Sequence, residues 1–166
     1  MKQEYDVILN KFSEIFPVPV INIANALGYE INYFIPDEDT IKISGFVDYK
    51  NKKIGINNLD SEYRQRFTIA HEIGHIINGD DAGNDFYIDY RDNIEGKNKD
   101  KKEMQANKFA INLLIPKNEF ILKFNEFKNL GRSDMLILMN LSLHFGVPEN
   151  IIKMQINNLN LIGQLV

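Results

Sequence analysis

Two of the three histidines in this 166-residue chain lie four residues apart, within the segment FTIAHEIGHIING at residues 67–79. At that spacing on a helix, the imidazoles of His71 and His75 lie on one face and can converge on a single metal ion. Glu72 is rotated by about 100° around the helix axis, close enough to take a proton from water that the ion binds. The HExxH pattern therefore predicts a metal site with a general base beside it.

A catalytic zinc site needs a third protein ligand, because such sites use three protein ligands and a water. The candidate is Glu103. On its predicted helix it shares a face with Ala106, Asn107 and Ala110, and the small alanines would let this helix approach the histidine helix closely. The helix dipole alone would also favour a first-turn glutamate. Five aspartates remain rival ligands: Asp80, Asp81, Asp85, Asp89 and Asp92.

The elements that must position these residues follow from the hydrophobic periodicity. Asp60 or Ser61 can cap the histidine helix, which Gly79 ends. Its apolar stripe would pack on a sheet and consists of Tyr63, Phe67, Ala70, Ile73 and Ile77. Three strands are predicted, at 29–34, 41–49 and 53–56, the last two forming a hairpin. Other helices are predicted from the N-terminus to the prolines at 17 and 19, and at 21–27, 103–114, 118–128, 133–144 and 149–159.

The long connection between residues 79 and 102 is rich in Asp, Asn, Gly and Lys and contains one aromatic island at 86–90. Connections of this length inside a compact domain are functional loops, lids or disordered segments. We therefore expect either a functional loop or a disordered segment here.

Composition indicates a single domain over residues 1–166, with a helical C-terminal subregion at about 133–166. The chain has no cysteine, and charged residues interrupt its first apolar segment, so we expect a cytoplasmic protein without a membrane span. The net charge of −4 gives no electrostatic footprint for direct nucleic-acid binding.

Two segments together carry a resemblance to a known family. RFTIAHEIGHIING at 66–79 and EMQANKFAINLLIP at 103–116 resemble the ImmA/IrrE family of zincin-like metallopeptidases, whose pattern is an arginine and FT before HExGH, then ExxAxxFAxxLLxP. The resemblance implies an α+β, small zincin-like (minigluzincin) fold. In it, a short three-stranded twisted sheet packs on the HExxH helix and on a second, glutamate-bearing helix, with additional N- and C-terminal helices.

The same resemblance implies zinc ligation by His71, His75 and Glu103, with Glu72 as the general base. It also implies that an extended substrate pairs with a sheet edge, expected at the strand 53–57. The implied substrate is a small helix-turn-helix transcriptional repressor, cut in a stress, phage or mobile-element response. Stabilising the oxyanion requires a donor, for which Tyr87, Tyr90 and His144 are the available types.

Other interpretations remain open from the sequence. The chain could be a zincin-like binding module or a toxin–antitoxin component that cleaves nothing, although the intact Glu72 argues against this. Residues 141–159 read as helix, turn and helix, but the four charges from residue 132 onward cancel, which disfavours DNA binding. Two histidines and a carboxylate also form the facial triad of iron oxygenases, and manganese or iron could replace zinc.

Overall fold

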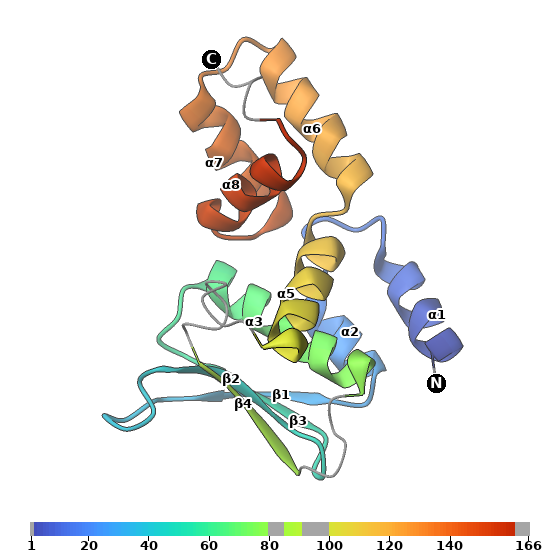
Figure 1. Ribbon diagram of the computed structural model, residues 1–166, viewed down its shortest axis with the longest axis vertical. Helices are drawn as coiled ribbons and strands as arrows, with labels where there is room; N and C mark the ends of the chain where they lie inside the picture. The colour runs from blue at the N-terminus through green and yellow to red at the C-terminus, as the bar shows by residue number, and fades with distance from the viewer. Residues whose placement is uncertain (1, 80–84, 91–99, 162–166) are drawn as a thin grey trace.

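The computed structural model describes residues 2–79, 85–90 and 100–161. Figure 1 shows helices α2, α3 and α5 over one face of a sheet, and a second group of helices, α6 to α8, farther from it. Seven helices lie within these residues: α1 (Lys2–Phe12), α2 (Val20–Ala26), α3 (Glu62–Asn78), α5 (Lys101–Leu114), α6 (Lys117–Asn129), α7 (Asp134–Phe145) and α8 (Glu149–Asn158). The strands are β1 (Glu30–Phe34), β2 (Ile43–Asp48), β3 (Lys53–Asn57) and β4 (Phe86–Tyr90).

The sheet has four strands in the order β1-β3-β2-β4. β1 runs parallel to β3, whereas β2 is antiparallel to both β3 and β4. The observed sheet therefore has one strand more than the three expected from the sequence, because the aromatic island at 86–90 forms β4 on the edge of β2. The expectation that the strand 53–57 offers a free edge is wrong as well, since β3 pairs on both sides.

Helix α3 carries the HExxH residues and begins and ends at recognisable signals. The side chain of Ser61 accepts a hydrogen bond from the backbone of Arg64, and Gly79 ends the helix in the left-handed conformation with φ of 72°. Residues 67–76 are all buried, and the apolar residues before and after the histidines therefore pack in the core. The helix thus holds its polar site residues inside the protein.

Helix α5 packs directly on α3, as the small residues on its face predict. Ala106 and Ala110 are fully buried. On the α3 side, a Cβ atom added to Gly74 would lie 3.0 Å from the Cα atom of Ala106 and 3.1 Å from its carbonyl oxygen. Because these are backbone atoms, the two helices are as close at this point as Gly74 allows.

Arg66 ties α3 to two distant segments. Its guanidinium donates to the carbonyl oxygen of Val18 at 2.7 Å and to that of Gly146, in the turn between α7 and α8, at 3.0 Å. In α8, three isoleucines that could have faced a DNA groove are buried instead: Ile151, Ile152 and Ile156. Among the described residues no single helix is long and apolar enough to cross a membrane; α7 and α8 reach that length and composition only together, across a 104° bend.

Candidate metal centre

Three side chains from two helices meet in a buried cluster on the face of the sheet that α3 and α5 cover (Figure 1). The Nε2 atoms of His71 and His75 lie 3.0 Å apart. The carboxylate of Glu103, from α5, places one oxygen 3.3 Å from Nε2 of His71 and the other 3.7 Å from Nε2 of His75. One ligand atom from each residue lies within 4.8 Å of the others, a spacing that fits a single cation between them.

Asn107 fixes the orientation of the first histidine. Its side-chain oxygen lies 3.0 Å from Nδ1 of His71. Because an amide oxygen only accepts hydrogen bonds, Nδ1 carries a proton, so Nε2, which faces Glu103, is the nitrogen whose deprotonation would free a lone pair for a metal ion. From the sequence, Asn107 is expected only on the face of Glu103; its position one turn after Glu103 is the signal that could have indicated this role.

Glu72 is fully buried, and among the described residues neither of its carboxylate oxygens has a hydrogen-bond partner. A Cβ atom added to Gly45 of β2 would lie 3.0 Å from Oε1 of Glu72 and 2.6 Å from Cγ2 of Thr68. Gly45 therefore leaves the room that this carboxylate occupies. A buried acidic group without a partner fits a site completed by a cation and its water.

Strand β4 adds two side chains to the cluster, because alternate residues of a strand lie on one face. The ring of Tyr87 lies over that of His75, with ring centroids 4.0 Å apart, and its hydroxyl donates a hydrogen bond to Glu103. Asp89 is fully buried and places Oδ2 3.8 Å from Nε2 of His71. From the sequence, Asp89 is one of five rival ligands; the structure places it beside the three-residue cluster.

The cluster concentrates negative charge. Glu72, Asp89 and Glu103 are three buried carboxylates facing two imidazoles, an arrangement that is costly without a compensating cation. Burial raises the pKa of Glu72 well above its usual value, and the charges of Asp89 and Glu103 raise it further. Burial also acts to raise the pKa of Glu103, but hydrogen bonds from His71 and Tyr87 outweigh it and lower that pKa.

Tyr87 is the one oxyanion-donor candidate that the described side chains bring to the site. Burial and its hydrogen bond to Glu103 raise the pKa of Tyr87, so the hydroxyl keeps its proton. His144 instead pairs with Glu119 at 3.0 Å and stacks on Phe16. The side chain of Tyr90 lies outside the described residues, as do Asp80, Asp81 and Asp92, and Asp85 is exposed.

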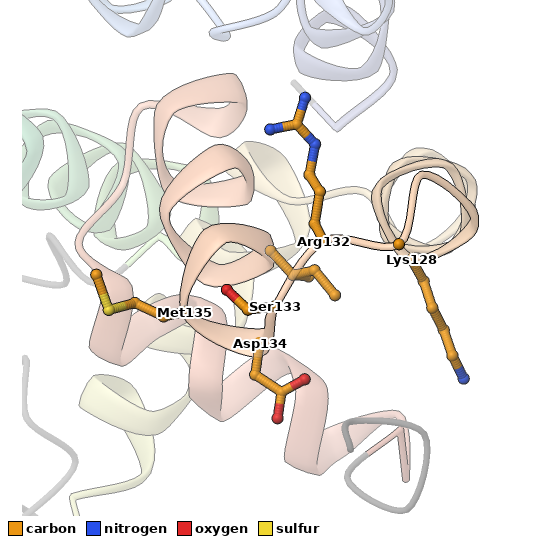
Figure 2. A pocket seen from close by; sticks show the side chains of 7 residues that line it. Lys128, Arg132, Ser133, Asp134 and Met135 are labelled. Carbon is orange, nitrogen blue, oxygen red and sulfur yellow. The ribbon is translucent and has the colours of Figure 1, made fainter.

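A surface pocket of about 630 Å³ lies at the junction of α6 and α7, away from the cluster. Figure 2 shows the charged side chains of Lys128 and Arg132 at this pocket, pointing in opposite directions. None of its lining residues belongs to the metal cluster: Lys128, Gly131, Arg132, Ser133, Asp134, Met135 and Ile137. The pocket therefore supplies no part of the site.

An HExxH helix, a glutamate from a second helix and a mixed sheet packed against them define a small α+β zincin-like fold with a cluster that could hold a metal. Residues 24–157 match the model of the Peptidase M78 family, described as the IrrE N-terminal-like domain. The chain belongs to this family, which confirms the resemblance seen in the sequence.

The fold is similar to that of a solved structure, a Mycobacterium tuberculosis transcriptional regulator, with a TM-score of 0.54 and 16% sequence identity. The match covers 91% of this chain and 45% of the regulator, so the chain spans less than half the length of that protein. At this identity the likeness shows the fold alone. No curated protein gave a significant sequence match.

Proposed function

We propose that this protein is a zinc-dependent endopeptidase. The observation that carries the proposal is the buried cluster itself: two Nε2 atoms and a carboxylate lie close enough to bind one ion, and beside them Glu72 has no hydrogen-bond partner among the described residues. His71, His75 and Glu103 would hold the ion, with manganese or iron as alternatives to zinc. Membership of a peptidase family supports this choice over oxygen chemistry.

A divalent ion held by this ligand set would polarise a peptide carbonyl and acidify a water. The chain's own residues would handle the proton. Glu72, with both oxygens free of hydrogen bonds to the described residues, would accept the proton from water and pass it to the departing amine. Tyr87 keeps a protonated hydroxyl at the cluster, so it is the donor available for the oxyanion.

The proposed substrate is a small helix-turn-helix transcriptional repressor, cut in a stress, phage or mobile-element response in the cytoplasm. The support is the family, together with a site whose ligands are fully buried, since general digestion needs an open cleft. Such a closed site favours one specific partner over many.

Metal analysis tests the ligand set. Glu103→Ala should lose most of the bound zinc, because its carboxylate supplies one of three ligands. Glu62→Ala is the matched control, since Glu62 is an exposed glutamate in the first turn of α3. Unchanged zinc in the Glu103 variant would remove this residue from the site.

Incubation with a small helix-turn-helix repressor, taken from a neighbouring gene where one is encoded there, tests the reaction. The wild type should cut it at one position, while Glu72→Gln should keep zinc and lose turnover, because the amide cannot accept the proton. Equal cleavage by both proteins would point to a contaminating protease.

A binding or toxin–antitoxin module without proteolysis is the second candidate, and the complete burial of the ligands favours it. Tight association with the repressor and no cleavage by the zinc-loaded wild type would support this candidate instead.

A further inference from the structure

The cluster is closed to any polypeptide in the structure described here. His71, Glu72 and His75 have no exposed surface, and Glu103 is 1% exposed. A peptide bond cannot approach the ligands unless some element of the chain moves first.

Strand β4 contacts each of the three proposed ligands. The ring of Tyr87 covers His75, its hydroxyl binds Glu103, and the carboxylate of Asp89 lies 3.8 Å from His71. The alternate residues Phe86 and Ile88 point outward and are 54% and 45% exposed. One five-residue strand therefore contacts all three proposed ligands with its inner face.

The position of β4 in the sheet is the position an extended peptide would take. β4 pairs antiparallel with β2 and forms an edge of the described sheet. Asp89 is opposite Gly45, the residue whose missing Cβ makes room for Glu72. A strand in this register thus lies beside both the general base and the ligands, and a sheet edge recruits extended chains through backbone hydrogen bonds.

We propose that β4 is an internal occupant of the substrate-binding edge, and that it must leave β2 before a polypeptide can pair with Ile43–Asp48. The inference rests on the proposed peptidase function. In the closed form, Asp89 brings an oxygen next to His71, the atom type that a scissile carbonyl would bring. An edge strand can detach in a local opening, without unfolding the rest of the sheet.

A disulfide lock tests this proposal, and the natural chain has no cysteine to interfere. Phe46 and Ile88 are direct partners across β2 and β4 on the outward face, so the pair Phe46→Cys and Ile88→Cys can be bridged. The probe is removal of bound Zn²⁺ by 1,10-phenanthroline, with hydrogen exchange of the β2 amides measured in parallel. The oxidised protein should release zinc at least about tenfold more slowly than the reduced protein, and adding reductant should restore the faster rate.

A lock on the other edge of the sheet is the matched control. Glu30 and Lys53 are partners across β1 and β3, and both are exposed. Glu30→Cys with Lys53→Cys should leave zinc removal unchanged in both redox states. Equal rates for the oxidised and reduced β4 lock would overturn the proposal.

A second variant removes the dependence on disulfide formation. Tyr87→Phe keeps the ring on His75 but loses the hydroxyl bond to Glu103, so zinc removal and β2 exchange should both accelerate while β3 exchange stays unchanged. No acceleration in either measurement would contradict a covering role for β4.

The two proposals fail differently. If the reduced lock and the wild type bind no zinc, or bind zinc and never cut the repressor, the peptidase function is wrong. If both cut the repressor and the oxidised lock cuts it equally fast, only the role of β4 is wrong.

Discussion

Gly74→Ala probes the distance between the two ligand-bearing helices. The new Cβ would lie 3.0 Å from the Cα atom of Ala106, and an ordinary contact begins at 3.4 Å, so α5 must recede by about 0.4 Å (3.4 minus 3.0). Glu103 lies less than one turn before Ala106 and would move with it. Metal–ligand distances tolerate only about 0.2 Å, so zinc affinity should fall by about 10- to 100-fold.

The same substitution should have a small effect on the metal-free protein. Overpacking costs about 1–3 kcal/mol, whereas alanine gains about 1 kcal/mol over glycine in a helix. The net loss in the free energy of unfolding is therefore about 0–2 kcal/mol. Urea denaturation of the metal-free protein and zinc titration against a chromophoric chelator measure the two effects separately.

Phe109 supplies the control for this reasoning. One ring atom of Phe109 would lie 3.2 Å from the new Cβ, but the backbone of Ala106 is closer. Adding Phe109→Leu to Gly74→Ala should therefore leave zinc affinity low. Wild-type affinity in the single variant, or recovery in the double variant, would refute the argument that backbone spacing sets the site.

Three further outcomes are expected. Asn107→Ala should weaken zinc binding by about 10- to 100-fold in the same titration, because His71 loses its orienting acceptor, whereas the exposed Gln105→Ala should not. Arg66→Gln should lower the free energy of unfolding in urea by about 2–4 kcal/mol, since two buried carbonyls lose their donor; Arg64→Gln, with its partly exposed ion pair, should cost under about 1 kcal/mol. The rise in melting temperature on adding zinc should be larger at pH 8 than at pH 6. Burial raises the pKa of Glu72, and in His71 the contacts with Glu103 and Asp89 outweigh the lowering by burial and raise its pKa. A pKa that is raised in the folded state stabilises the metal-free fold at low pH, and this stability is lost as pH rises; zinc also competes with the proton on its ligand His71. Equal shifts at both pH values would contradict this reasoning.

The local parts of the site could be predicted from the sequence because their geometry depends on one helix at a time. His71, Glu72 and His75 are placed by helical spacing, and Ala106 marks the face of α5 that approaches α3. Pairing Glu103 with the histidines needed a contact between two helices, for which small residues were the physical signal. The predicted boundaries of α3 also agree closely with the observed ones, because Ser61 caps its start and Gly79 caps its end through local backbone interactions.

Strand β4 could not be predicted in the same way. Its five residues lie in a long polar connection, and their identity as a strand depends on pairing with β2, far away in the chain. The covering contacts of Tyr87 and Asp89 follow from that pairing and were missed with it. The sequence also contains no sign that β1 pairs in parallel with β3. Without that pairing, β3 looked like an edge strand of the sheet.

Cation binding and β4 pairing must be coupled, because both act on the same buried charges. Closing β4 brings Asp89 to a site that already contains Glu72 and Glu103, and this repulsion is relieved when a cation is present. By linkage, the cation strengthens β4 pairing by the same factor by which β4 strengthens cation binding. A substrate that displaces β4 must then replace its contacts to the ligands, so only a segment that pairs well with β2 can open the loaded site. Strand β4 would thus restrict the site to partners whose segment pairs well with β2.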